Sequence, residues 1–76
     1  MSKPIETCHQ AVGLRIKMTR EFLSITQEEL AKKVGISRGS LANIEVGRQR
    51  LLLHNIEEFA KALGVSPKHL LKGIWF

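Results

Sequence analysis

Cysteine is almost absent from this sequence. Cys8 is the single cysteine among 76 residues, so neither an internal disulfide nor a CxxC metal motif is available. The three histidines, His9, His54 and His69, stand far apart, and no HExxH helix or other spacing of metal ligands appears. We therefore expect neither a metal nor any other cofactor.

Residue patterns typical of a catalytic site are also lacking. The sequence has no phosphate-cradling glycine loop and no set of acid, base and nucleophile residues at a recognisable spacing. The candidate hydroxyls, Ser37 and Ser66, each stand where the N-cap of a helix is expected, and capping accounts for them. We therefore do not expect an enzyme or a small-molecule substrate.

Long apolar runs are missing as well. No stretch approaches the ~20 apolar residues that span a bilayer, and the first ten residues, MSKPIETCHQ, lack the apolar segment of a secretory signal. We expect a soluble protein that stays in the cytoplasm and has no membrane contact.

Acidic residues are outnumbered by basic ones. Twelve Lys and Arg against seven Asp and Glu give a formal charge of +5 and a pI near 9.9. This balance suits a polyanionic partner, but many small domains are basic without binding nucleic acid, so charge alone leaves the question open.

A domain of this length buries only about 60 % of its unfolded surface, which makes a dimer advantageous.

The best-defined stretch is TQEELAKKVGISRGSLANIE, residues 26–45. Thr26 and Glu29 have the spacing of a capping box, in which each side chain satisfies a backbone N–H at a helix start. Gly35 suits the left-handed position after a helix, and Ser37 is a favourable N-cap for a second helix. The stretch therefore predicts two short helices joined by a tight turn.

The rest of the chain also predicts helices and no strand. Hydrophobic periodicity and punctuation place helices at about residues 8–23, 27–34 and 38–46, a fourth that ends at Leu63, and a fifth that begins at Pro67. Residues 1–9, which include Pro4, are expected to form an irregular or frayed arm. Residues 74–76, Ile-Trp-Phe, form an apolar tail. The predicted fold is an all-α, compact five-helix bundle.

The first predicted helix has two apolar stripes. Val12, Ile16 and Leu23 form the expected core side. A second stripe lies roughly opposite and consists of Ala11, Leu14, Met18 and Phe22. Two interpretations remain open: the second stripe overlaps a neighbouring loop, or it receives the C-terminal tail or a partner subunit.

The paired helices have the form of a helix-turn-helix, whose second helix enters the major groove of DNA. The exposed face of that helix needs small or hydrogen-bonding residues, and it carries Arg38, Gly39, Ser40 and Asn43. Arg pairs bidentately with guanine and Asn with adenine, each contributing roughly 1–3 kcal/mol of discrimination. The alternative for Ser40 and Asn43 is an ordinary solvated helix face.

The segment from Val12 to Leu71 resembles the Cro/C1-type (XRE-like) helix-turn-helix family of phage repressors and bacterial regulators. The resemblance covers about four fifths of the chain. It rests on the following residues: Ile25, Thr26, Gln27, Glu28, Glu29, Leu30, Ala31, Gly35, Ile36, Ser37, Leu41, Ile44, Glu45, Gly47, Ala60, Leu63, Gly64, Val65 and Ser66. It implies a bundle of the lambda-repressor-like type, with a DNA-binding domain over residues 10–73 between the arm and the tail.

The resemblance also implies roles for individual residues. Arg38, Gly39 and Asn43 fall on base-reading positions, with Ser37 and Ser40 near phosphate or bases. Gln27 falls on a position that contacts the DNA backbone and braces the recognition helix, and Arg20 and Glu45 fall on a structural ion pair. After the recognition helix, Arg48 and Arg50 are expected along the DNA backbone, with Lys32 and Arg15 as weaker candidates.

The sequence departs from the family pattern in three places. Gly39 stands where a longer polar side chain is common, and Leu51 and Leu52 replace the usual proline and polar cap before the fourth helix. That helix start is therefore expected to be uncapped and apolar. The second stripe and the tail add apolar surface that a bare family domain does not require.

Two functional hypotheses follow. The first is a sequence-specific regulator of transcription that binds double-stranded DNA, most simply a repressor acting as a homodimer on a palindromic operator. The second is a protein-interaction adaptor, such as the antitoxin of a toxin-antitoxin pair. It would bind its partner through the second stripe, Leu51, Leu52 and the tail. Neither the operator nor the biological setting, whether prophage, restriction-modification or toxin-antitoxin locus, follows from the sequence.

Overall fold

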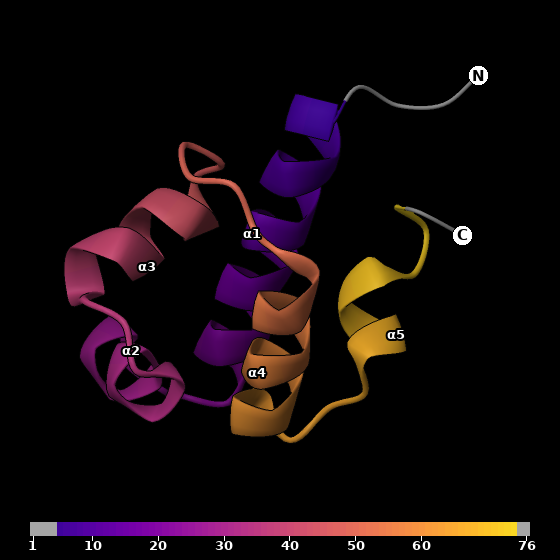
Figure 1. Cartoon of the computed structure of the whole chain (residues 1–76). Coiled ribbons are helices and arrows are strands. Elements are labelled where there is room, and N and C mark those ends of the chain that lie inside the picture. The colour runs from indigo at the N-terminus through magenta and orange to yellow at the C-terminus, as the bar shows by residue number, and fades with distance from the viewer. Residues whose placement is uncertain (1–4, 75–76) are drawn as a thin grey trace.

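Five helices make up the computed structural model, which describes residues 5–74, with the side chains of residues 5–7 and 53 left out. They are α1 (Ile5–Phe22), α2 (Gln27–Val34), α3 (Arg38–Glu45), α4 (Leu53–Leu63) and α5 (Pro67–Leu71). The α2–α3 pair packs on one side of α1 and α5 on another, with α4 between them (Figure 1). The predicted all-α, five-helix bundle is confirmed.

The expected irregular arm is wrong for residues 5–9, because α1 begins at Ile5. Cys8 and His9 are buried against the rest of the bundle, so tertiary contacts hold turns that show no sustained apolar period in the sequence. Residues 1–4 and the tail residues Trp75 and Phe76 lie outside the described part of the chain. Two further boundaries shift by one residue: α1 ends at Phe22 and α3 at Glu45.

One hydrophobic core lies between the helices. Phe59 of α4 and Ile16 of α1 are fully buried, and residues from all five helices surround them. The other buried members are Val12, Leu30, Ala31, Leu41, Ile44, Leu51, Ile56, Ala60, Leu63, Leu70 and Leu71. Ile74, the described residue of the tail, packs half-buried against the same core. None of the described helices is both long enough and apolar enough to cross a membrane.

The expectation that the start of α4 is uncapped is wrong for one backbone N–H group, that of Leu52. The Oδ1 atom of Asn55 accepts a hydrogen bond from the backbone N–H of Leu52 at 3.1 Å. This is one half of a capping box, supplied from the third position of the helix. Leu51 turns into the core, whereas the side chain of Leu52 remains 60 % exposed.

The two stripes of α1 have different surroundings. Val12 and Ile16 are buried as expected, but Leu23 is 42 % exposed because it follows the end of the helix. On the second stripe the exposed fractions are 51 % for Leu14, 57 % for Met18 and 88 % for Phe22. Within residues 5–74, neither a loop nor Ile74 covers these three side chains.

Candidate nucleic-acid interface

Local hydrogen bonds fix the start of α2. The Oγ1 atom of Thr26 accepts from the backbone N–H of Glu29, and Oε1 of Glu29 accepts from the backbone N–H of Thr26, both at 3.1 Å. The hydrogen bond from the Thr26 backbone, followed by that involving its side chain, lowers the pKa of Glu29. The contribution of this box to folding is therefore present at neutral pH and is lost as the pH falls through the lowered pKa.

The turn between α2 and α3 is equally well defined. Gly35 adopts a left-handed conformation with φ of 83°, and its N–H and that of Ile36 both donate to the carbonyl oxygen of Ala31. The Oγ atom of Ser37 then accepts from the backbone N–H of Ser40 at 3.0 Å and caps α3. The capping arrangement expected from the sequence is confirmed at both helices.

The helix α3 turns two unlike faces to its surroundings. Leu41 and Ile44 are buried in the core, while the expected base-reading residues lie on the other side. Arg38, Gly39 and Asn43 are exposed and Ser40 is half-buried. A Cβ atom added to Gly39 would meet only Ser37 Oγ, at 4.0 Å. Nothing within the described chain therefore requires a glycine at this position.

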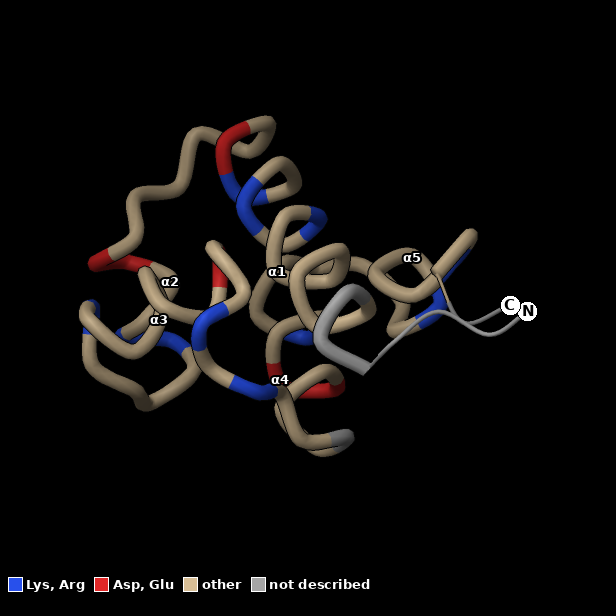
Figure 2. The backbone as a smooth tube through the Cα atoms, turned by 90° about the horizontal axis from the view of Figure 1, so that it is seen from above, with Lys and Arg blue, Asp and Glu red and all other residues tan. Residues whose placement is uncertain are grey.

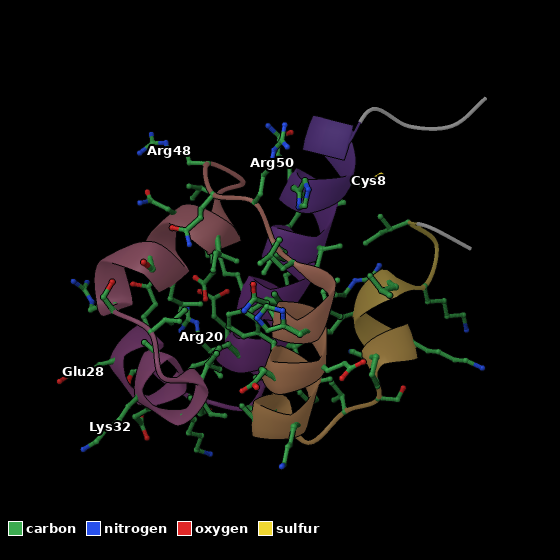
Figure 3. The ribbon with its side chains drawn as sticks, viewed as in Figure 1. Cys8, Arg20, Glu28, Lys32, Arg48 and Arg50 are labelled. Carbon is green, nitrogen blue, oxygen red and sulfur yellow. The ribbon has the colours of Figure 1, made fainter. Side chains whose placement is uncertain are left out.

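Behind α3 lies a buried ion pair between α1 and the last residue of α3. Nε of Arg20 donates to Oε2 of Glu45 at 2.7 Å, and Nη2 donates to Oε1 at 3.1 Å. Nη1 of Arg20 also donates to the carbonyl oxygen of Ile25 at 2.9 Å. The hydrogen bond to Glu45 raises the pKa of Arg20, so its charge persists at every accessible pH. Figure 3 shows Arg20 inside the bundle, between α1 and the α2–α3 pair.

Gln27 joins the same network from the first position of α2. Its Nε2 atom donates to Oε1 of Glu45 at 2.9 Å, and its side chain is half-buried. The Glu45 carboxylate, in a residue that is 3 % exposed, thus accepts from both Arg20 and Gln27. The network ties the start of α2 and the end of α3 to α1. It also neutralises the negative charge of Glu45 near α3.

A basic segment follows α3 and folds back on it. The backbone N–H of Arg48 donates to the carbonyl oxygen of Asn43 at 2.8 Å. Arg48 and Arg50 are exposed, and both side chains extend outward from the same end of the molecule (Figure 3). Basic positions are visible along the segment that joins α3 to α4 (Figure 2). This end can therefore present positive charge beside the exposed face of α3.

The two weaker candidates for DNA contact, Arg15 and Lys32, have different surroundings in the structure. Nη1 and Nη2 of Arg15 donate to the carbonyl oxygens of His69 and Lys72, at 2.7 and 3.1 Å, so Arg15 stabilises the C-terminal end of α5. These contacts commit its guanidinium group to α5, so Arg15 is left out of the proposed DNA contacts. Lys32 is exposed and shares a shallow surface hollow with Arg38 and Glu28.

Three residues position the α3 region through contacts that the sequence did not predict, although one of them, Gly47, is among the residues that carry the family resemblance. A Cβ atom on Gly13 would overlap the carbonyl oxygen of Ile44, so α1 and α3 touch at this glycine. Gly47, with φ of 79°, packs directly against Gln10 of α1. A glycine inside an otherwise helical pattern is a recognisable sign of close backbone approach, and Gly13 could have been found in this way.

His9 is the third residue. Its Nδ1 atom accepts a hydrogen bond from the backbone N–H of Leu51 at 3.1 Å, and both residues are buried. Because that N–H is a donor only, Nδ1 must carry the lone pair. The bond fastens the end of the basic segment to α1. No local pattern in the sequence indicates this pairing across 42 positions.

No group of three or more metal-ligating side chains occurs among the residues that the structure describes. What the geometry brings together is an exposed polar helix face, a basic segment beside it and a buried hydrogen-bond network that orients both. This arrangement suits binding to a groove lined by phosphates.

Comparisons with known proteins agree with this geometry. A family model described as "Helix-turn-helix" matches residues 16–70. Control protein C.BamHI from Bacillus amyloliquefaciens is 44 % identical over 60 residues, covering 78 % of this chain and 74 % of that protein.

Solved structures agree as well. The restriction-modification controller protein C.AhdI from Aeromonas hydrophila has a TM-score of 0.77 and 31 % identity, over 80 % of this chain and 92 % of that one. The biofilm regulator SinR, solved in complex with DNA, has a TM-score of 0.73 and 32 % identity, over 80 % of this chain and 98 % of that one. The chain therefore belongs to the Cro/C1-type helix-turn-helix family of DNA-binding transcriptional regulators.

Proposed function

We propose that the protein is a sequence-specific repressor that binds a palindromic operator as a homodimer, with residues 10–73 as its DNA-binding domain. The observation that carries the proposal is the exposed polar face of α3, held from behind by Arg20, Glu45 and Gln27. In this proposal α3 of each copy enters the major groove, and the half-sites lie one helical turn, about 34 Å, apart. The protein would act in the cytoplasm, on the nucleoid.

The base-reading roles go to α3. In this proposal Arg38, at the first position of the helix, pairs with a guanine, and Asn43, five residues later, pairs with an adenine. Ser40 has a hydroxyl free for a base or phosphate, since its backbone N–H is the part that Ser37 caps. The open space at Gly39 lets the helix backbone approach DNA closely.

The backbone contacts flank this face. Arg48 and Arg50 would neutralise phosphates beside the groove, and Ser37 and Gln27 at the two helix starts would donate hydrogen bonds to phosphate oxygens. Such contacts set the register on the duplex and dominate the salt dependence of binding.

The similarity to C.BamHI and to the restriction-modification controller C.AhdI supports the operator of a restriction-modification locus as the target. The adaptor hypothesis is not favoured as the main function, because the matching family consists of DNA-binding regulators. The exposed apolar surface that suggested it therefore needs another explanation.

The test begins with selection of bound DNA from a random duplex pool. Arg38→Ala and Asn43→Ala should each relax the preference at one base position, because each loses about 1–3 kcal/mol of discrimination. Arg50→Ala should weaken binding to all sequences alike and reduce the salt slope by about one.

Lys61→Ala, an exposed change on α4, is the matched control and should leave affinity and preference as they are. Unaltered base preference in both α3 variants would overturn the proposed reading face.

A further inference from the structure

An apolar side chain stands on the polar side of α3. Val46 is the C-cap of this helix, and its backbone N–H still donates to the carbonyl oxygen of Ala42. Its side chain is 55 % exposed, whereas Leu41 and Ile44, the large apolar residues within α3, are buried in the core. Packing within the described chain therefore leaves most of the valine available to a ligand.

Val46 lies on the same side of α3 as the proposed base readers. At about 3.6 residues per turn, Val46 falls about 20° from Gly39 and about 60° from Asn43 around the helix. It lies about 4.5 Å beyond Asn43 along the helix axis, and stacked bases are about 3.4 Å apart. If Asn43 pairs with a base as proposed, Val46 therefore lies over a neighbouring base pair.

The turn after α3 holds Val46 in this place. The backbone N–H groups of Arg48 and Gln49 both donate to the carbonyl oxygen of Asn43, at 2.8 and 3.3 Å. These hydrogen bonds close a turn that contains Val46 and begins at the residue proposed to read adenine. The backbone of Val46 is therefore fixed relative to Asn43.

The side chain of Val46 also has the reach that a base contact needs. The methyl carbons of valine are one bond nearer to Cα than the terminal amide atoms of asparagine. A carbon–carbon contact, at about 3.5–4.0 Å, is correspondingly longer than a hydrogen bond, at about 2.9 Å. Val46 and Asn43 therefore reach base edges at about the same depth. Gly39, on the same side, has no side chain to keep the helix away from the groove.

The major groove offers one methyl group that an exposed valine fits. Base edges there present hydrogen-bond donors and acceptors, and thymine adds the methyl group at C5. A valine cannot pair with a donor, an acceptor or a phosphate oxygen, and covering one of these without a hydrogen bond costs free energy. The C5 methyl group is therefore the partner that suits Val46. 5-Methylcytosine carries the same group at the same atom.

We propose that Val46 recognises the C5 methyl group of a pyrimidine next to the base that Asn43 reads. This inference rests on the DNA-reading face in the proposed function and adds an apolar contact to its hydrogen bonds. Val46 is thus a specificity-determining residue that distinguishes a methylated pyrimidine from an unmethylated one.

The experiment uses the full chain and the palindromic duplex that selection from the random pool identifies. Each thymine is replaced in turn by uracil, which keeps the base pair and lacks the C5 methyl group. One replacement, next to the position that Asn43→Ala relaxes, should lower the affinity of the wild type roughly fourfold for each half-site changed, the effect of burying one methyl-sized group.

Val46→Ala completes a double-mutant cycle with the uracil duplex. The variant should bind the thymine duplex with a similar loss of affinity and should no longer distinguish thymine from uracil at that position. Leu52→Ala is the matched control, because Leu52 is exposed to a similar fraction, 60 % against 55 %, and lies outside α3. It should bind both duplexes as the wild type does.

A second pair of duplexes separates the two sources of the methyl group. These duplexes carry cytosine or 5-methylcytosine at the position of the sensitive thymine. Tighter binding of the methylated duplex by the wild type, but not by Val46→Ala, would mean that the methyl group is recognised on either base. Equal binding of the two duplexes would restrict recognition to thymine.

Two results would overturn the inference. If the wild type binds every uracil duplex as tightly as the thymine duplex, it recognises no methyl group. If Val46→Ala weakens binding to thymine and uracil duplexes by the same factor at every position, Val46 contacts the sugar-phosphate wall of the groove instead of a base.

Failure of this inference and failure of the proposed function are distinguishable. A base preference that Arg38→Ala and Asn43→Ala relax, without any effect of uracil, would retain the proposed function and refute the role of Val46. A wild-type chain that selects no base sequence from the random pool would refute both.

Discussion

The two outward faces of the bundle are built on opposite principles. The α3 face is polar, and a chain of buried hydrogen bonds from Arg20 through Glu45 to Gln27 stands directly behind it. The outer side of α1 is apolar at Leu14, Met18 and Phe22, and these three residues project from a single helix. A surface that reads bases needs a fixed orientation, because a bidentate hydrogen bond tolerates little misalignment. A surface that associates by burying apolar area instead needs a complementary shape and enough area.

The helix α1 serves both faces. One of its sides touches α3 at Gly13 and holds Glu45 through Arg20, and its opposite side carries the exposed Leu14, Met18 and Phe22. The comparison therefore shows that one helix both supports the α3 face and carries an exposed apolar stripe, and that it uses different residues for each. Changes on the inner side should harm folding and DNA binding, whereas changes on the outer side should leave the free energy of unfolding of the monomer almost unaltered.

The largest effect should come from Glu45→Ala, which breaks the support of the α3 face. Removing one partner of a buried ion pair leaves Arg20 uncompensated and typically costs about 3–5 kcal/mol of unfolding free energy. Urea denaturation measures the loss. Glu57→Ala, an exposed change on α4, should cost less than about 1 kcal/mol. Equal losses of unfolding free energy in the two variants would mean that the buried network behind α3 stabilises the fold no more than an exposed carboxylate does.

A smaller effect should come from Gly13→Ala. The added methyl group overlaps the carbonyl oxygen of Ile44, so α1 and α3 must separate at a cost of about 1–3 kcal/mol, even though alanine favours a helix. Gly39→Ala is the matched control on the other side of α3, where the new Cβ meets open space. It should stabilise the protein by up to about 1 kcal/mol. The two variants should thus move the urea midpoint in opposite directions.

The smallest of the three effects should come from His9→Phe. Phenylalanine also has an aromatic ring but lacks the acceptor atom. The buried backbone N–H of Leu51 then has no partner, at a cost of about 1–2 kcal/mol of unfolding free energy. With the basic segment released, the salt slope of DNA binding should also fall.

His9→Asn restores an acceptor oxygen near the position of Nδ1 and should recover most of both losses. His54→Phe, an exposed change on α4, should alter neither measurement. If the salt slope of DNA binding is the same in His9→Phe and in the wild type, His9 does not influence DNA binding through the basic segment.

How much the sequence predicts depends on the range of the interaction. The helix-turn-helix is predictable because its determinants are local: Thr26 and Glu29 are three residues apart, and Gly35 and Ser37 bracket the turn. The core side of α1 follows from periodicity at Val12 and Ile16. Each of these signals lies within one or two helical turns.

The misses share a different origin. The early start of α1 depends on the burial of Cys8 and His9 by segments distant in the sequence. The charge of Arg15 suggests a DNA contact, whereas in the fold its guanidinium group donates to carbonyl oxygens at the end of α5, 54 and 57 positions away. Leu23 followed the helical period, yet α1 ends one residue earlier. Only the folded chain brings such partners together.

The bond between Gln27 and Glu45 has a consequence for how such proteins diversify. The side chains that hold α3 in place are separate from Arg38, Gly39 and Asn43, which are exposed and make no side-chain bond to the core in the described structure. New combinations at these three positions would leave the scaffold intact. If these residues read bases as proposed, a protein of this kind could acquire a new target through a few surface changes, without passing through unstable intermediates.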